Sequence, residues 1–185
     1  MKLLKKFVWL LASVALVSCG GDDDDNTPSV PALVLNQANL AGTYTLGRLV
    51  GQGEESTTLS SGTSVVVSTT EDTGSAFDGA AITLAADGTY TTTGSYVLTT
   101  LTTVEGETTD GTDIINLGSN GTYAVDTDAS TLTFTVVEAG LEDVIFEGSF
   151  DVLDFDEDEL ELFSDTSVED GSNIITNSTT YSFTR

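Results

Sequence analysis

The side chains that could carry out chemistry are few in kind. The chain has one cysteine, Cys19, no histidine, and 30 aspartate and glutamate residues. Histidine-based triads and paired-thiol chemistry are therefore excluded. The carboxylates would by number permit a carboxylate-pair glycosidase. They gather, however, in turn-like segments, where aspartate is favoured because it hydrogen-bonds its own backbone. We therefore predict no catalytic residues, no cofactor and no enzyme activity.

One acidic segment has the spacing of a metal-binding loop. Asp154, Asp156 and Asp158 alternate like the first ligands of a calcium loop. The sixth position is Glu159, where such a loop needs glycine, and the twelfth is Asp165 rather than glutamate. A turn that exposes three aspartates to water explains the pattern more simply. We predict no metal site here.

The charge of the chain is strongly negative and unevenly distributed. Three of the five basic residues lie within the first six positions, so removal of residues 1–18 would leave a net charge of 2 − 30 = −28. A surface this acidic repels phosphate backbones and anionic headgroups. Nucleic-acid binding is therefore not expected, and the acidic residues are interpreted as a solvated surface.

The first 18 residues have the organisation of an export signal. Lys2, Lys5 and Lys6 precede an apolar run at 7–17, in which Ser13 is the one polar residue. A helix needs about 20 apolar residues to span a bilayer, so this run is too short. Its length and its charged start instead predict a signal peptide over residues 1–18.

The end of this leader resembles the lipobox of bacterial lipoproteins. Residues 16–19 read Leu-Val-Ser-Cys, an aliphatic residue, two small or aliphatic residues and a cysteine. The resemblance implies cleavage before Cys19, lipidation of that cysteine with fatty acids such as palmitate, and attachment to a membrane. Each buried CH₂ group of an acyl chain contributes roughly 0.8 kcal/mol to such anchoring.

Residues 20–25, Gly-Gly-Asp-Asp-Asp-Asp, resemble the surface-export tag of lipoproteins from the Bacteroidetes. This resemblance implies an outer-membrane location at the cell surface. The same residues would also form a solvated spacer that its own like charges keep extended. Together with Pro28 and Pro31, they predict a lipidated acidic tether over residues 19–39.

The remainder, residues 40–185, predicts a single all-β domain. Thr, Val, Tyr and Phe dominate, and apolar residues alternate with polar ones at 131–136, 159–162 and 181–184. Asp87-Gly88 is a strong hairpin signal, and Asn120-Gly121 and the acidic segments 126–130 and 154–158 suggest further turns. We expect eight to ten strands in sequential order. Residues 51–79 fit the pattern poorly and suggest either a mobile loop over a barrel mouth or one poorly marked strand with long loops.

Several short motifs resemble those of small lipocalin-like domains in Bacteroidetes-type lipoproteins. They are LAGTYTL at 40–46, ITLAADGTY at 82–90 and the closing YSFTR at 181–185. The resemblance implies an antiparallel up-and-down meander, closed or nearly closed into a barrel of about eight strands. First and last strands are neighbours in such a barrel. We therefore put forward the hypothesis that Arg185 lies near Tyr44, against the alternative that it extends into solvent.

The aromatic residues of the domain could either fill the core or line a cavity for an apolar ligand. This set comprises Tyr44, Phe77, Tyr90, Tyr96, Tyr123, Phe134, Phe146, Phe150, Phe155, Phe163, Tyr181 and Phe183. The leading hypothesis for function is non-enzymatic binding, of a small apolar molecule in the barrel or of a surface partner. The alternative is a structural or adhesive surface module, an immunoglobulin-like sandwich that binds a protein or glycan. The oligomeric state stays open.

Overall fold

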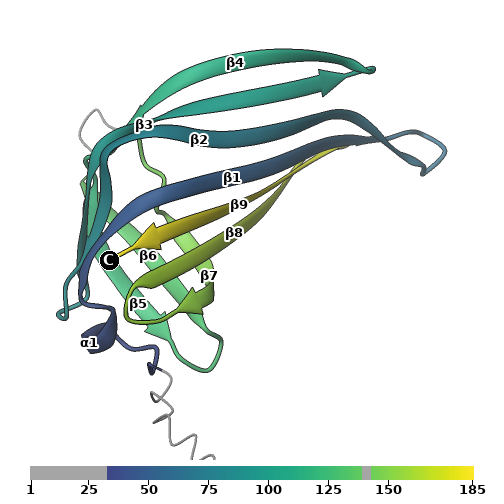
Figure 1. The fold of residues 1–185 in the computed structure, drawn as a ribbon. Helices are drawn as coiled ribbons and strands as arrows, with labels where there is room; N and C mark the ends of the chain where they lie inside the picture. The colour runs from purple at the N-terminus through teal and green to yellow at the C-terminus, as the bar shows by residue number, and fades with distance from the viewer. Residues whose placement is uncertain (1–32, 139–142) are drawn as a thin grey trace, which may run out of the picture. The chain divides into compact units, whose positions relative to one another are not determined.

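A computed structural model describes residues 33–138 and 143–185. Its elements are one short helix and nine antiparallel strands (Figure 1). They are α1 (Gln37–Leu40), β1 (Gly42–Thr58), β2 (Ser64–Leu84), β3 (Thr89–Val104), β4 (Glu107–Asn116), β5 (Asn120–Asp126), β6 (Thr131–Glu138), β7 (Gly148–Phe155), β8 (Glu159–Asp170) and β9 (Asn173–Thr184).

Eight of the strands close into a ring. The hydrogen-bonded order is β2-β1-β9-β8-β7-β6-β5-β3-β4, and a further pairing of β2 with β3 completes the circle. The first and last strands, β1 and β9, are neighbours. The predicted up-and-down barrel is therefore confirmed. The sequential pairing also lacks the Greek-key crossings that the immunoglobulin-like alternative requires.

Five strands of the ring continue beyond it and, together with β4, form an open sheet, which we call the extended sheet. It comprises residues 50–58, 64–73, 97–104, 107–116, 164–170 and 173–180, in the order β2-β1-β9-β8 on one side and β2-β3-β4 on the other. It is open because β5 pairs only with 89–91 of β3, and β7 reaches only Phe163 of β8. Figure 1 shows these long strands curving away from the barrel.

Both expectations for residues 51–79 are wrong. The segment forms neither a loop nor one isolated strand. It holds the upper part of β1 and most of β2, which pair from Val50 to Thr58 in one long hairpin. Threonine, which is frequent here, has a high strand propensity because it is branched at Cβ. Polar residues occupy both faces of this hairpin, so the apolar alternation that marks a strand is missing.

Glycines permit the strand bends where the hairpin of β2 and β3 leaves the barrel. Gly79 and Asp78 both lie opposite Ser95 in a bulge, and Gly94 lies beside it with φ of +87°.

The predicted turn at Asn120-Gly121 is wrong, because both residues lie within β5. Gly121 pairs with both Tyr90 and Val136, and an added Cβ would overlap the Thr135 carbonyl. The glycine allows close approach of the strands there.

Aromatic side chains fill the middle of the barrel. Phe134 lies at its centre, with ring centroids 5.1 Å from Tyr90, 5.5 Å from Phe146 and 5.5 Å from Phe150. Phe146 comes from the connection between β6 and β7 and also contacts Tyr181, with the ring centroids 5.3 Å apart. The Tyr90 hydroxyl donates to the Phe146 carbonyl at 3.0 Å and fixes this connection inside the barrel. Most of the predicted aromatic set is therefore core.

The helix α1 begins within the segment expected to be tether, residues 19–39, ends at Leu40 and packs against the barrel. Leu40 is fully buried, and the Gln37 side-chain amide donates to the Tyr123 carbonyl at 3.3 Å.

Beside the helix, the Arg185 guanidinium carbon lies 5.4 Å from the centroid of the Tyr44 ring. The same side chain donates to the Ala41 carbonyl. The predicted cation–π contact is confirmed, and it ties the last strand to the first.

The buried tyrosines make the free energy of unfolding of the barrel decrease as pH rises in the alkaline range. Burial raises the pKa of Tyr123 and of Tyr181 to about 12. In the unfolded chain these hydroxyls ionise near pH 10, so between about pH 10 and 12 only the folded state keeps the protons. The free energy of unfolding is therefore constant just below pH 10 and falls as pH rises above it, by on the order of 2 kcal/mol.

Urea unfolding midpoints measured from about pH 8 to 11.5 check this expectation. The Tyr181→Phe variant, which cannot ionise at that position, should lose less stability across the same window than the parent chain. Equal losses in both proteins would contradict the assignment to Tyr181.

Candidate functional site

The two faces of the extended sheet carry different sets of polar side chains. The inner face continues the barrel interior and is crossed by two rows of small or polar residues. In strand order from β4 to β8, the first row consists of Gly111, Thr100, Asp72, Gly51, Thr179 and Ser164. The second row consists of Thr109, Thr102, Thr70, Gly53, Asn177 and Thr166. The rows contain no apolar side chain, so the barrel core ends beneath them.

Side chains of the inner face bond to one another. The Thr100 hydroxyl donates to the Asp72 carboxylate at 2.5 Å. Glu55 accepts from the Ser68 hydroxyl at 3.4 Å and from the Asn173 amide at 3.2 Å. At the centre of the sheet, a side chain on Gly53 would collide with Asn177 at 2.5 Å. The inner face is therefore a polar layer in which some side chains, among them Thr100, Asp72 and Glu55, have partners within the chain.

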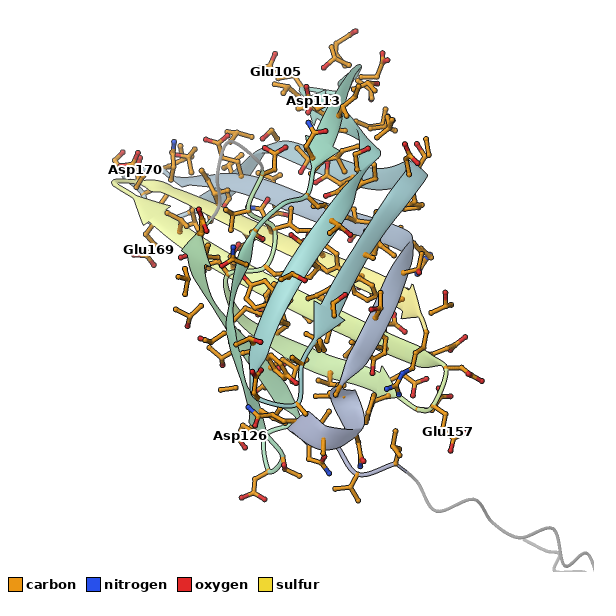
Figure 2. The ribbon with its side chains drawn as sticks, turned by 90° about the vertical axis from the view of Figure 1, so that its left-hand side faces the viewer. Glu105, Asp113, Asp126, Glu157, Glu169 and Asp170 are labelled. Carbon is orange, nitrogen blue, oxygen red and sulfur yellow. The ribbon has the colours of Figure 1, made fainter. Side chains whose placement is uncertain are left out.

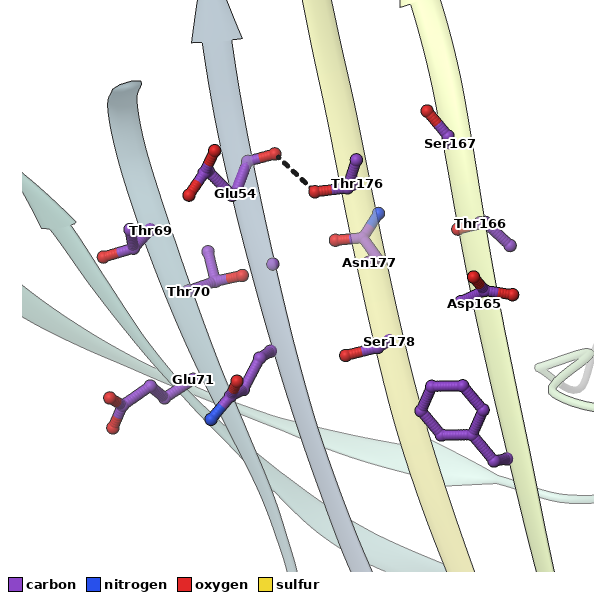
Figure 3. Close-up of a pocket in the computed structure, with 13 residues that line it drawn as sticks. Glu54, Thr69, Thr70, Glu71, Asp165, Thr166, Ser167, Thr176, Asn177 and Ser178 are labelled. Carbon is purple, nitrogen blue, oxygen red and sulfur yellow. Dashed lines mark hydrogen bonds between the residues drawn. The ribbon is translucent and has the colours of Figure 1, made fainter. Parts of the chain in front are cut away.

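The outer face carries an open hollow of about 570 Å³ over β2, β1, β9 and β8 (Figure 3). The side chains that line it come from alternate positions of the four strands. They include Gln52, Glu54, Thr69, Glu71, Phe163, Asp165, Ser167, Thr176 and Ser178. The strand register explains the grouping, since Gln52 lies opposite both Glu71 and Ser178, and Ser178 lies opposite Asp165.

The lining offers hydrogen-bonding groups that are free to meet a ligand. The Thr176 hydroxyl donates to the Glu54 backbone carbonyl at 3.4 Å, as the dashed line in Figure 3 shows. Among the residues that the structure describes, the side chains of Gln52, Glu71 and Asp165 make no hydrogen bond within the chain. They combine an amide, which donates and accepts, with carboxylates, which only accept. The half-buried Phe163 adds an aromatic ring at one side of this polar lining.

Two further, separate depressions lie along β1 and β9 toward the barrel and, with the hollow, form a track on the outer face. A second depression of about 230 Å³ shares Gln52 and Ser178 with the hollow and adds Val50 and Thr180. Further along, Arg48 borders a third, of about 350 Å³, together with Glu159 and Glu161. From Glu54 to Arg48 the strand rises about 3.3 Å per residue, so this track is roughly 20 Å long. It suits a linear ligand better than a compact one.

The charged side chains of the extended sheet are all acidic. Residues 49–181 contain no lysine, arginine or histidine. Figure 2 shows Glu105, Asp113, Glu169 and Asp170 around the far end of the sheet, and Asp126 and Glu157 at the opposite end of the barrel. An anionic ligand would therefore meet repulsion over most of this surface, whereas a neutral or cationic one would not.

The residues that the sequence raised as candidate sites fall into two groups, those outside the described part of the chain and those in the acidic turn 154–158. Cys19, the leader 1–18 and most of the tether 19–39 lie outside the described residues. Within 33–138 and 143–185, no helix is long and apolar enough to cross a membrane. The calcium-like segment forms a turn, in which the Asp156 carboxylate accepts from the backbone of Asp158 and Glu159, both at 2.7 Å. The same described part of the chain holds no cluster of three or more potential metal ligands.

Comparison with known protein families, curated proteins and solved structures finds no significant match. The interpretation of the hollow therefore depends on its own geometry. Sequence reasoning did not identify it, because its residues come from four strands and belong to segments of unremarkable polar composition. The tripeptides Gln-Gly-Glu at 52–54 and Asp-Thr-Ser at 165–167 each occur once, so no repeated motif pointed to the hollow.

Proposed function

We propose that the protein is anchored to the outer membrane by lipid on Cys19, displayed at the cell surface, and binds a neutral glycan without catalysis. The lipobox-like residues 16–19 support the anchor, and the acidic residues 22–25 support surface display. The binding proposal depends on one observation. Gln52, Glu71 and Asp165 line an open hollow beside Phe163, with side chains that have no partner among the described residues.

The chemistry of the lining fits a sugar chain. Sugar hydroxyls can donate to the carboxylates of Glu71 and Asp165, and bonds to ionised acceptors are stronger than bonds between neutral groups. The Gln52 amide can both donate to and accept from the same ligand. The face of the Phe163 ring can pack against the apolar C–H face of a pyranose. The open, elongated shape of the hollow admits a chain from the side.

The filled barrel supports binding outside rather than inside. A carrier of small apolar molecules uses a concave, mostly apolar pocket. Here the centre of the barrel holds the rings of Tyr90, Phe134, Phe146 and Phe150, which contact one another. We therefore assign the binding function to the extended sheet and treat an interior apolar ligand as an outcome that the experiment must distinguish.

Titration calorimetry of the full chain in a mild detergent tests the proposal. The probes are linear neutral oligosaccharides of glucose, of mannose and of xylose. Phe163→Ala and Gln52→Ala are each expected to weaken binding of the best probe at least tenfold, or about 1.4 kcal/mol. Thr45→Ala is the matched control, because Thr45 is exposed on β1 but does not line the hollow. It should bind like the parent chain.

Two results would reject the glycan proposal. One is the absence of binding by every neutral oligosaccharide at millimolar concentration. The other is saturable binding of a fluorescent fatty acid, with one molecule bound per chain and no effect of either hollow variant. That outcome would favour the barrel interior as the site.

A further inference from the structure

The strand β4 has a free outer edge. It pairs with β3 through ten consecutive residue pairs from Glu107 to Asn116, and no strand among the described residues pairs with its other side. Within 33–138 and 143–185, the backbone contact on this edge lies at its base, where the Asp143 backbone donates to the Asn116 carbonyl at 2.9 Å. The backbone along 107–115 therefore presents unpaired hydrogen-bonding groups of the kind that template another strand.

This edge lacks most of the devices by which proteins protect exposed strands. β4 contains no proline and no lysine, and its register with β3 has no bulge. Its side chains are mainly small or branched, which suits a flat pairing surface. Ile114 is 66% exposed and lies opposite Val97 of β3, so the outer face of this edge also offers an apolar contact.

The remaining protective device is negative charge, and it determines which partner fits. Glu107, Asp110 and Asp113 lie along β4. A second copy would bring its own carboxylates to this edge, from β4 or from the upper part of β8, where Asp165, Glu169 and Asp170 lie. Like charges directly opposite one another are destabilising. Residues 49–181 contain no cation that could neutralise these groups.

We propose that the β4 edge is a docking site for an extended, basic segment of a partner protein, which adds as a further strand. Main-chain hydrogen bonds would supply affinity, and alternate side chains would supply specificity. Asp110 lies on the outer face with Ile114, and Glu107 and Asp113 lie on the inner face, as their β3 partners indicate. The fitting segment therefore carries lysine or arginine on both faces and an apolar residue next to Ile114. This site is separate from the glycan hollow and does not depend on it.

The probe is a fluorescent ten-residue peptide with the repeat Lys-Lys-Val-Val, which places lysine and valine on both faces of a strand. It is titrated into the full chain and followed by anisotropy. Binding should be saturable and should weaken with salt. Asp110→Asn and Asp113→Asn together should weaken it at least fivefold. Two control substitutions should leave peptide binding unchanged. One is Asp151→Asn, at an exposed position on β7. The other is Glu169→Gln, on the upper part of β8, which pairs with β9 but with no strand on its other side among the described residues. A peptide with methylated alternate backbone nitrogens should bind at least tenfold more weakly, because it cannot complete the ladder.

Three outcomes would overturn the proposal. Equal binding of the methylated peptide would indicate adsorption by charge alone. Equal loss in Glu169→Gln would indicate a diffuse acidic surface. A stable dimer of the full chain that the Asp110 and Asp113 substitutions strengthen would assign the edge to a second copy.

Discussion

Replacing Phe146 by alanine is expected to lower the free energy of unfolding by about 3–5 kcal/mol, the usual cost of emptying a buried phenylalanine site. The Phe146 side chain is 1% exposed, and its ring lies 5.3–6.0 Å, between centroids, from those of Phe134, Phe150, Tyr181 and Phe183. The segment that carries it is not a strand, so once the ring is removed it would be held by bonds such as that from the Tyr90 hydroxyl to the residue 146 carbonyl and not by a ladder. Urea unfolding monitored by circular dichroism gives the measurement.

Val144→Ala is the matched control, because Val144 belongs to the same connection but is 38% exposed. It should cost much less than Phe146→Ala. The Phe146→Ala variant should also bind small apolar molecules such as benzene, since cavities lined by apolar side chains remain dry and accept such ligands. A loss below about 1 kcal/mol would mean that Phe146 does not support the core as described.

Replacing Gly94 by alanine is expected to destabilise the fold by roughly 2–5 kcal/mol, through two additive effects. Its φ of +87° is costly for any residue with a Cβ, by about 1–2 kcal/mol. In addition, the new Cβ would overlap the backbone of Gly79 across the bulge, and backbone atoms cannot move aside as a flexible side chain could. Such overpacking typically costs 1–3 kcal/mol more.

Gly62→Ala separates these two effects. Gly62 has nearly the same φ, +83°, but an added Cβ there meets nothing within 4 Å. It should therefore show the conformational cost alone. Equal destabilisation by both substitutions would contradict the close approach of β2 and β3 at the point where they leave the barrel.

Much of the barrel could be predicted because its strands have one wet and one buried face. Leu132 and Phe134 alternate with threonines, and both are buried in β6. Asp87-Gly88 does connect β2 to β3, with Gly88 at φ +84° and the Asp87 carboxylate accepting from the Thr89 backbone at 3.0 Å. Closure of the meander suggested that Arg185 lies next to Tyr44, but the sequence left a side chain in solvent as the alternative, and the structure decides for the contact.

The extended sheet could not be predicted for a physical reason. Its strands are wet on both faces, so they have no apolar period, and their pairing partners lie anywhere from 3 positions away, as for Val104 and Glu107, to 130 positions away, as for Val50 and Thr180. The pairing of Glu55 with both Ser68 and Ile175 illustrates this range. Gly121 was misassigned because Asn-Gly is common in turns, whereas here a close strand approach requires the glycine. The position of Phe146 depends on the path of an irregular connection, which carries no periodic signal.

Binding on the outer face of the extended sheet is the central claim, and hydrogen exchange of the full chain tests it most directly. Backbone amides would be compared with and without a saturating amount of the best-binding neutral oligosaccharide. Exchange is expected to slow at 52–54, 165–167 and 176–178, which line the hollow, and to stay unchanged at 132–134 in the barrel. Protection confined to the barrel strands, with none at the hollow, would contradict the account.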